Sequence, residues 1–504
     1  MSEANQNLER EVKLGAWPGF ELPELDGFSK GVKTAKGAER VLDATYFDTP
    51  DLRLIRWGVT VRHRTGDDPP WTVKLPSEIA IPGVLSRLEI GFRGSRDRVP
   101  DAVSALVRVH RRSAQLEVVA RLTTRRRHLA IHNGKGKVVA NVDDDEVSVV
   151  ADGRVTARFR EVEAELAQGA SVELLSTLVA RLREAGAGAP DPTPKLVRAL
   201  GPRALAPPDV VAVNLPGDPT IGDLARLSLA SALLRIIHSD PVMRLDADVE
   251  GVHQMRVGAR RLRSDLRTLG DAVDREWADE LRSELAWMAG VLGPVRDADV
   301  LIVRLTRQGD RLALSDRPDT ATLIERLRRE RGKALELAVN ELAGDRYGAL
   351  IDCLVDAASN PRLTNSAKRP AVDVLPRTVG SAWRRLDKAV RAMDKESSGD
   401  SHRVRIFAKR ARYAGEMAIP VVGKSAKQFS TKLARVQDVL GERQDAVVAE
   451  SWLRQAGPIL TRGQALVAGQ LLSLQRDAFG ADSDSEWKTS WGDVSQKRVT
   501  AWLR

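Results

Sequence analysis

The sequence predicts an α+β multidomain protein with an antiparallel β-barrel in its first part and an all-helical second part. Three observations support this prediction. Residues 1 to about 185 alternate charged and apolar side chains with a period of two, which is typical of strands. From Thr220 onward, long amphipathic segments with helical periodicity take over. The helical part also repeats its own sequence, which indicates duplicated helical bundles.

Length and composition narrow the class of protein further. The chain has 504 residues, a length typical of two to four domains, and 42% of them are hydrophobic, which excludes a largely disordered chain. The apolar runs are shorter than the ~18 to 20 residues of a membrane helix, and the polar N-terminus has no signal core. The single cysteine, Cys353, cannot form an internal disulfide. We therefore expect a cytoplasmic protein.

Changes in composition along the chain predict the domain boundaries. A stretch rich in proline, glycine and alanine separates the strand-like part from the helical part. A second loop-like stretch, 359–377, divides the helical part into halves of similar length. The predicted units are a first domain at 1–203, a linker at 204–217, and a helical domain at 218–504 with bundles at about 218–358 and 376–504.

Charged residues of the predicted strands gather on one face. Because residues two apart in a strand share a face, Glu9, Glu11 and Lys13 point one way, while Val12 and Leu14 point the other. The same arrangement recurs along the β part. Its charged faces carry Arg62 and Arg64, Lys74, Arg87 and Glu89, Arg125 and Arg127, Asp143 and Asp145, and Glu161, Glu163 and Glu165.

Two interpretations fit such faces. The first is the solvated outer side of an ordinary sheet, which usually mixes in Ser, Thr, Gln and Asn. The second is a closed barrel whose lumen is lined by charges of both signs, and the unbroken carboxylate and Arg/Lys ladders favour it. Carboxylates gathered in a lumen repel one another unless a hard cation such as Mg²⁺ or Mn²⁺ joins them. Cations in the same lumen suit phosphate oxygens.

This ordered set of residues resembles the CYTH domains, the triphosphate tunnel metalloenzymes. Glu9-x-Glu11-x-Lys13 matches the family signature, and the segment 44–52 (ATYFDTPDL) resembles its second landmark. The match continues in order to Lys195, over about the first 195 residues. The resemblance implies an eight-stranded antiparallel tunnel that binds a triphosphate with a divalent metal. Family members include inorganic, thiamine and RNA triphosphatases and class IV adenylate cyclases.

The resemblance also implies roles for individual residues. The expected reaction is attack of water on a terminal phosphoryl group, assisted by a metal. Glu89 is expected either to bind metal or to orient an arginine. The metal ligands would be Glu9, Glu11, Asp143, Asp145, Glu161, Glu163 and Glu165. The triphosphate would be held by Lys13, Arg62, Arg64, Lys74, Arg87, Lys195 and either Arg125 or Arg127, both of which suit the tunnel face. The catalytic set would be Glu9, Glu11, Lys13, Lys74 and Glu89.

A cationic stripe marks the helical part. His253, Arg256, Arg260, Arg263 and Arg267 fall within about 80° of one another on a helix. One interpretation is a solvated basic face paired with acids of a neighbouring helix. The duplicate keeps the pattern, which favours a surface for a long polyanion instead. Its residues are His402, Arg405, Lys409 and Arg412, and a second match follows in step around Asp297 and Asp445.

This part resembles the CHAD domain, a helical domain with conserved histidines that is often fused to CYTH, over about 218–504. The resemblance implies paired helical bundles that bind inorganic polyphosphate. The binding residues would be His253, Arg256, Arg260, Arg263, His402, Arg405, Lys409 and Arg412. For Asp297 and Asp445 we expect a structural role, such as anchoring arginines.

The leading hypothesis is a metal-dependent triphosphatase acting on inorganic triphosphate, with a second domain that binds polyphosphate and could place the protein at polyphosphate granules. The alternatives are a polyphosphate-binding protein without catalysis, an adenylate cyclase and another organic triphosphatase. Nucleic acid is not an expected partner, because aromatic residues make up only 4% of the chain. A membrane is not expected either.

Overall fold

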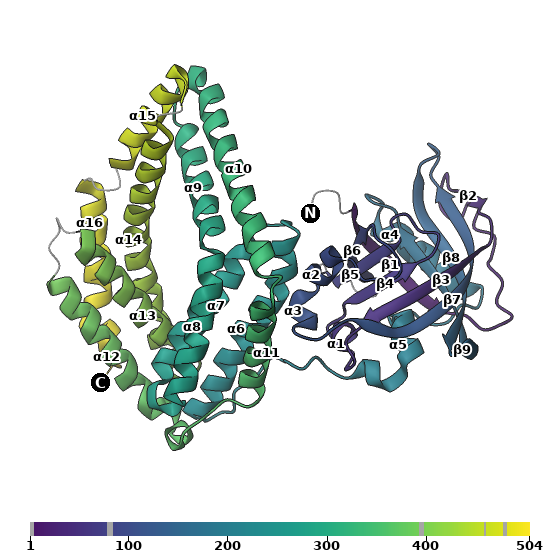
Figure 1. Ribbon diagram of the computed structural model, residues 1–504, viewed down its shortest axis with the longest axis horizontal. Helices are drawn as coiled ribbons and strands as arrows, with labels where there is room; N and C mark the ends of the chain where they lie inside the picture. The colour runs from purple at the N-terminus through teal and green to yellow at the C-terminus, as the bar shows by residue number, and fades with distance from the viewer. Residues whose placement is uncertain (1–4, 78–83, 393–397, 458–459, 477–480, 504) are drawn as a thin grey trace. The chain divides into compact units, whose positions relative to one another are not determined.

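A computed structural model of the chain describes residues 5–77, 84–392, 398–457, 460–476 and 481–503 (Figure 1). Within these ranges, the side chains of residues 5, 398–402 and 481–484 lie outside the description. The chain forms two compact units, Met1–Asp209 and Val210–Arg504.

The N-terminal unit is an antiparallel barrel. Among the described residues, eight strands close in the order β7-β3-β4-β5-β6-β1-β9-β8, because β8 pairs again with β7, while β2 adds to the edge of β7. The predicted eight-stranded barrel is therefore confirmed. The strands are β1 Asn5–Gly15, β2 Lys33–Lys36, β3 Arg40–Asp48, β4 Thr60–Arg64, β5 Trp71–Pro76, β6 Leu85–Phe92, β7 Glu117–His132, β8 Val138–Ala151 and β9 Arg154–Leu166.

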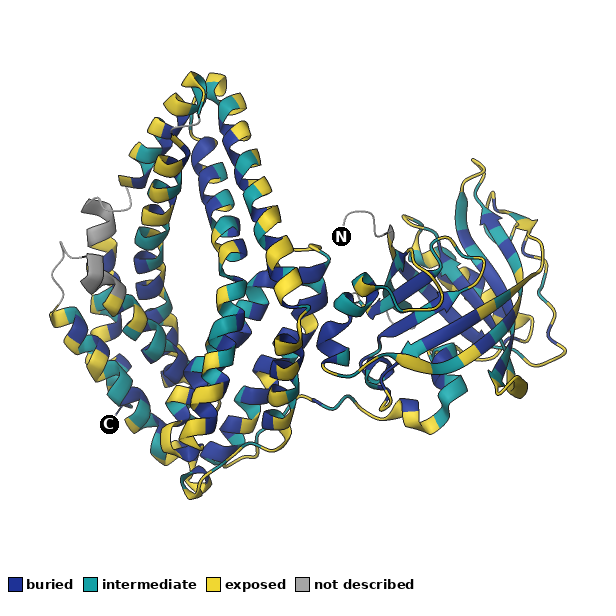
Figure 2. Cartoon of the chain, in the orientation of Figure 1, coloured by how far each residue is buried: buried dark blue, intermediate teal, exposed yellow. Residues whose placement is uncertain are grey.

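The alternation in the sequence assigns the two faces of these strands. On β1, Val12 and Leu14 are buried in an apolar core under α4 (Val172–Glu184), which contributes three fully buried leucines. The side chain of Ser171 caps α4 by accepting a hydrogen bond from the Leu174 N–H. Each buried leucine stabilises the fold by about 1.5–3 kcal/mol. Figure 2 shows the resulting dark bands of buried residues along the barrel strands.

A buried carboxylate organises the turn after β3. Asp48 is fully buried and accepts backbone N–H bonds from Thr49 at 2.6 Å, Leu54 at 2.8 Å and Ile55 at 3.0 Å. These bonds hold the short helix α1 (Arg53–Arg56) against the barrel. The segment 44–52, which resembles the second landmark of the CYTH family, therefore owes its turn to the hydrogen bonds that Asp48 accepts. Two further short helices, α2 (Asp101–Leu106) and α3 (Arg108–Arg111), follow β6.

The last helix of the unit brings a lysine to the barrel. Leu196 and Val197 of α5 (Lys195–Leu200) are buried in a core that includes barrel residues such as Leu122. The helix is followed by the 3-10 turn η1 (Gly201–Leu205). The predicted linker, 204–217, begins inside this unit, since Asp209 forms an ion pair with Arg112.

The C-terminal unit is helical. Helices α6 and α7 pack together, as do α13 and α14, and α7 contacts α13. Gly251 lets α7 approach α6, because a Cβ there would lie 2.5 Å from the backbone nitrogen of Met243. The helices are α6 Ile221–Arg244, α7 Glu250–Leu269, α8 Arg275–Val291, α9 Gly293–Gly309, α10 Arg317–Glu341, α11 Asp345–Ser359, α12 Ala371–Arg391, α13 Ser398–Val422, α14 Lys424–Ala456, α15 Arg462–Arg476, α16 Ala481–Ser495 and α17 Lys497–Thr500, with 3-10 turns η2 Gly270–Ala272, η3 Leu314–Asp316 and η4 Asn365–Lys368.

The predicted loop at 359–377 is shorter than the sequence indicated. Helix α12 already begins at Ala371, so Pro376 lies inside it. A proline removes one backbone hydrogen bond and disfavours a helix. Here the helically spaced apolar face that includes Leu375 and Val379 is buried, and its packing overrides that cost. No helix in the described ranges is both long and apolar enough to cross a membrane.

Candidate functional site

The inner side of the barrel gathers the charged residues that the sequence placed in a lumen. Strand pairing sets Glu11 opposite Glu165 and Lys13 opposite Glu163. These side chains border a cavity of about 180 Å³. Its lining also includes Asn7, Glu9, Tyr46, Thr60, Arg62, Arg64, Thr72, Lys74, Arg87, Glu89, Arg126 and Lys195.

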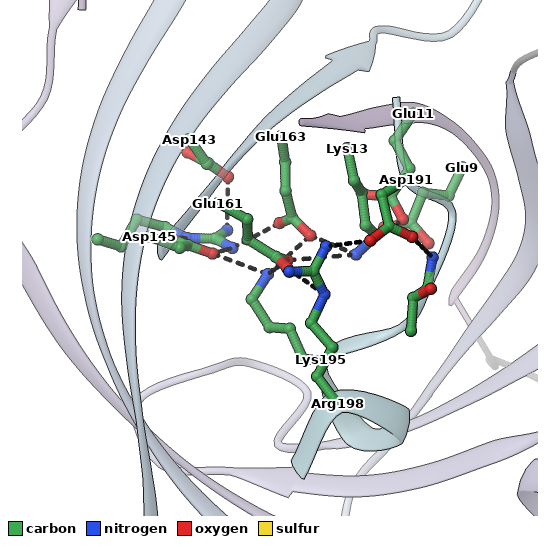
Figure 3. Close-up of polar contacts among 12 residues, drawn as sticks. Glu9, Glu11, Lys13, Asp143, Asp145, Glu161, Glu163, Asp191, Lys195 and Arg198 are labelled. Atoms are coloured by element: carbon green, nitrogen blue, oxygen red, sulfur yellow. Dashed lines mark hydrogen bonds and ion pairs between the residues drawn. The ribbon is translucent and has the colours of Figure 1, made fainter. Parts of the chain in front are cut away.

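Lysines hold many of the lumen carboxylates in ion pairs, several of which are visible in Figure 3. The Nζ of Lys195 lies 2.7 Å from Glu163, 2.8 Å from Glu161 and 2.9 Å from Asp145. The Nζ of Lys74 lies 2.7 Å from a carboxylate oxygen of Glu9, on the neighbouring part of the wall. The predicted ligands of metal and of phosphate are thus brought together, but they are paired with one another.

The pairing keeps buried groups charged. Burial favours the neutral form of Lys13, but Glu11 and Glu163 outweigh burial and raise the pKa of Lys13. Burial would likewise raise the pKa of Glu163, yet Lys13 and Lys195 hold it well below its usual range. At neutral pH the lumen therefore carries fixed charges of both signs.

Some arginines of the lumen have no such partner. Within the described residues, neither Arg62 nor Arg87 forms an ion pair with a carboxylate, and the Nε of Arg62 is buried without a hydrogen-bond partner. Arg64 contacts Asp67, while the neighbouring Arg62 and burial lower the pKa of Arg64. Burial favours the neutral form of Arg62, but Tyr46, Glu89 and Asp67 outweigh burial and raise its pKa, so the group stays charged. Its buried Nε donor still lacks an acceptor, which is costly unless an anion binds it. This part of the wall suits phosphate oxygens.

One carboxylate stands out on the opposite side of the cavity. Burial and the nearby Glu9 raise the pKa of Glu165 to about 8. Within the described part of the chain, Glu165 has no ion pair with a lysine or arginine. A divalent cation would relieve the repulsion between the carboxylates of Glu165 and Glu9. Oxygen donors are the ligands that Mg²⁺ and Mn²⁺ prefer. Glu9, Glu11 and Glu165 therefore supply the donor chemistry that such an ion requires.

The predicted metal ligands are not arranged as a finished coordination shell. Among the described residues, no group of three or more acidic, histidine or cysteine side chains has the geometry to hold a metal ion. The ion pairs explain this arrangement. Asp143 and Asp145 contact Arg126, and Glu161 and Glu163 contact Lys195. Metal binding at these positions would require the carboxylates to leave their cations.

The prediction that Arg125 or Arg127 faces the tunnel is wrong. Arg126 lines the cavity instead, with its guanidinium 2.6 Å from Asp145 and 3.0 Å from Glu163. Arg125 and Arg127 are exposed on the outer side, where both contact Glu39. Three consecutive arginines satisfy either parity, so strand alternation alone could not choose between them.

Sequence reasoning also missed uncharged residues of the lumen. Tyr46 on β3 lines the cavity, together with Asn7, Thr60 and Thr72. Tyr46 lies in the landmark segment at 44–52, which was the available signal. At the wall near Arg126, the Nδ1 of His128 lies 2.6 Å from Asp143.

In the helical unit, α7 and α13 bring together four cations from the two repeats, Arg256, Arg260, Arg405 and Lys409, which we name the α7–α13 cation cluster. Burial, followed by Arg405 and Arg260, lowers the pKa of Lys409 to about 8. Burial also lowers the pKa of Arg256, while Asp297 opposes the shift. The cluster therefore holds positive charge that its carboxylates do not balance.

The remaining residues predicted to bind polyphosphate differ in their surroundings. Burial and the nearby Arg296 lower the pKa of His253, which favours the neutral imidazole. Arg412 donates to Glu416 at 2.7 Å and to Gln437 at 3.1 Å, so its charge is already compensated. His402 lies on α13, but its side chain is outside the described residues.

Comparison with known proteins agrees with this division of the chain. The family model of the CYTH domain matches residues 7–193, and that of the CHAD domain matches residues 228–454. CYTH domains include triphosphatases and cyclases and generally use divalent metals.

Relatives match both domains together. The chain is 30% identical over 485 residues to Uncharacterized protein MT2285 of Mycobacterium tuberculosis strain CDC 1551 / Oshkosh and to Uncharacterized protein Rv2226 of strain ATCC 25618 / H37Rv. Each alignment covers 91% of this chain and 91% of the relative.

Two solved structures are also similar to the chain. PptA from Streptomyces chartreusis is 24% identical with a TM-score of 0.46, covering 54% of this chain and 99% of that one. The CHAD domain from the plant Ricinus communis is 26% identical with a TM-score of 0.46, covering 56% and 95%. On the two family matches and the full-length relatives, this chain belongs to the family of proteins that join a CYTH triphosphate-tunnel domain to a CHAD domain.

Proposed function

We propose that the barrel lumen hydrolyses a triphosphate, with inorganic triphosphate as the first candidate, in a reaction that depends on Mg²⁺ or Mn²⁺. The observation that carries the proposal is the set of groups on the cavity wall that form no ion pair. Among the described residues, Arg62 and Arg87 form none with a carboxylate, and Glu165 forms none with a lysine or arginine. Such a wall offers donors to phosphate oxygens and acceptors to a metal.

The cationic side of the lumen would bind the substrate. Arg62, Arg64 and Arg87 present planar guanidinium groups, which can each bond two phosphate oxygens. Lys74 and Lys195 would exchange part of their carboxylate contacts for phosphate contacts. This exchange keeps every buried cation paired while the substrate enters.

The acidic side would hold the metal through Glu9, Glu11 and Glu165. When bound, a divalent ion lowers the pKa of a coordinated water and neutralises charge on the phosphates. Lys13 keeps Glu11 oriented through a 3.2 Å contact, and Glu89 keeps Lys74 in place at 3.0 Å. In the hydrolysis, a water oxygen adds to the terminal phosphorus and the anhydride P–O bond breaks, which yields phosphate and diphosphate.

Phosphate release from inorganic triphosphate, thiamine triphosphate and ATP, each with Mg²⁺ or Mn²⁺, tests the proposal. We expect E9Q/E11Q to lose at least about 100-fold in rate, since it removes charged ligands from the site. E39Q is the matched control, because Glu39 is half exposed on the outer side of the barrel. Equal rates in E9Q/E11Q and the wild type would refute the proposal. Product analysis with ATP separates hydrolysis from cyclisation.

A second candidate is a tunnel that binds phosphate without turnover. The ion pairs that occupy most lumen carboxylates favour it, since they compete with a metal. This candidate predicts that triphosphate binds equally well with EDTA or with Mg²⁺ and that no phosphate is released. Metal-dependent phosphate release would exclude it.

For the helical unit we propose binding of inorganic polyphosphate by the α7–α13 cation cluster. A long chain of phosphates supplies the negative charge that this cluster lacks. The pKa of Lys409 is lowered by burial and then by Arg405 and Arg260, and a bound anion would offset the repulsion from these two arginines.

A further inference from the structure

The duplicated helices α7 and α13 build two equivalent corners, of which one is compensated in charge and the other is positive. In the first corner, Arg261 lies 3.1 Å from Asp265 and also contacts Glu416 of the other helix. Glu416 is shared with Arg412, at 2.7 Å. Two arginines and two carboxylates thus compensate one another, and Asp265 is buried.

The second corner has lost both carboxylates. The alignment that matches His253 with His402 replaces Arg261 by Arg410, Asp265 by Ala414 and Glu416 by Arg267. The arginine is therefore retained, while one acid becomes alanine and the other becomes a further arginine. The two carboxylates that balance the arginines of the first corner are therefore missing from the second corner.

A cavity of about 400 Å³ occupies this second corner, between α7, α12 and α13. Its walls carry Arg267 and Arg410, and α12 adds Arg377 and Arg385. None of these four arginines forms an ion pair with a carboxylate in the part of the chain that the structure describes. Asp271 is the one carboxylate among the lining residues, and it accepts a hydrogen bond from Ser366.

The uncompensated charge has an electrostatic consequence. Burial and then the nearby Arg410 lower the pKa of Arg267 to about 10. Burial, Arg282 and Arg385 lower the pKa of Arg410 in the same way. Arg267, Arg377 and Arg385 are exposed and Arg410 is half-buried, so solvent screens part of this charge, and an anion bound between them would remove the remaining repulsion.

We propose that this pocket binds a compact anion made of two or three linked phosphate groups. Arginine forks match the geometry of phosphate oxygens, and the hydroxyl of Ser264 adds a donor. A free oligophosphate and the phosphates of a nucleotide share this chemistry. Leu269, Val374 and Phe407 give the pocket an apolar wall, which favours the nucleotide.

The pocket is distinct from the α7–α13 cation cluster. Lys409 and Arg410 are consecutive, so their side chains leave α13 about 100° apart. Lys409 lies among Arg405 and Arg260 of the cluster. The guanidinium of Arg410 instead lies 5.5 Å from the ring centre of Phe407, on the pocket side. Variants of these two neighbours should therefore affect different sites.

The test is calorimetric titration of the full chain with tripolyphosphate and with ATP, in EDTA so that metal-dependent hydrolysis does not occur. We expect R385Q/R410Q to lose one bound ligand per chain, or to bind it at least tenfold more weakly, whereas R307Q, at an exposed arginine paired with Glu442, keeps wild-type values. Tighter binding of ATP at this site would identify a nucleotide, and equal binding a free oligophosphate. Unchanged titrations of R385Q/R410Q would overturn the proposal. So would loss of the same bound ligand in K409Q, since the pocket would then be part of the cation cluster.

A second variant excludes misfolding as the cause. R267E/A414D rebuilds the acids of the first corner in the second. We expect it to lose the same ligand while its melting temperature rises, because Arg410 gains carboxylate partners. A variant that retains the ligand despite the two new acids would overturn the proposal. The titration concerns only the helical unit, so failure here is separable from failure of the tunnel to hydrolyse triphosphate.

Discussion

In the two regions proposed to bind phosphate, the surroundings shift the pKa of a buried lysine in opposite directions. In the tunnel, Lys13 is surrounded by Glu11, Glu161 and Glu163, and its pKa is raised. In the α7–α13 cation cluster, Lys409 is surrounded mainly by arginines, and its pKa falls to about 8. Burial disfavours the charged form in both places, so the neighbours decide the direction.

The difference indicates how each region would bind an anion. Phosphate entering the tunnel competes with carboxylates for the cations, and a metal can take over the carboxylates that are released. Phosphate reaching the helical cluster meets little competition and needs no metal. The tunnel is therefore suited to a short substrate that arrives with a divalent ion. The helical cluster is suited to a long anion held by charge.

Replacing each lysine by methionine is the strongest test of this comparison. K13M leaves buried Glu11 without its ion-pair partner, while Glu163 keeps Lys195 and Arg126, and it should destabilise the N-terminal unit by about 3–5 kcal/mol. K409M removes a repelled charge and should leave the helical unit unchanged or more stable. Calorimetric melting of the full chain separates the two effects. Destabilisation by K409M comparable to that by K13M would contradict the comparison.

The next largest effect is expected for Arg126. It joins Asp145 and Glu163 within the tunnel, so R126Q should lower triphosphate hydrolysis by roughly 100- to 1,000-fold. R125Q and R127Q alter exposed neighbours and should stay within about twofold of the wild type. The rates of the three variants under one set of conditions check the prediction. Loss of activity in R125Q with a normal R126Q would reverse the assignment of the inner face.

Arg126 is also a charged lumen residue that the sequence alone did not predict. Period-two alternation placed most of the lumen correctly, because acidic and apolar residues exchange faces clearly on β1 and β9. On β7 three arginines are consecutive, and either parity looks charged. The partner strand resolves the choice, since Arg126 pairs in register with Asp145. Which residue lies opposite Asp145 depends on the register between β7 and β8, and the sequence of one strand does not reveal that register.

The helical unit shows a different limit. Helical spacing correctly grouped Arg256 and Arg260 on one side of α7. It also predicted Arg412 as a binding residue, although Glu416 compensates it from the next turn of the same helix. Glu416 follows Arg412 by four residues in the sequence, and this spacing on a helix predicts the ion pair. The contact of Arg261 with Glu416 depends on how α7 and α13 pack, which periodicity does not reveal.

Polyphosphate binding should depend on arginines from both repeats. R256Q/R405Q removes two charges from the cation cluster, and we expect the affinity for long-chain polyphosphate to fall by roughly 10- to 100-fold at low salt. The slope of log affinity against log salt should also become shallower, because fewer counterions are released. R307Q is the control, since Arg307 is exposed and paired with Glu442. An unchanged affinity in R256Q/R405Q would place the polyphosphate site elsewhere.

The smallest predicted effect is a pH dependence carried by Lys409. Its pKa of about 8 lies below the ordinary lysine value because of burial and its cationic neighbours, so the ammonium loses its proton between pH 7 and 9. A bound polyanion favours the protonated form, and affinity must therefore decrease as the pH rises through this range. We expect a decrease of roughly two- to fivefold, as for an ion contact of about 0.5–1 kcal/mol. Polyphosphate affinity at pH 7, 8 and 9 measures it, and K409R should abolish the dependence because arginine stays charged. A dependence of equal size in K409R would show that another group titrates.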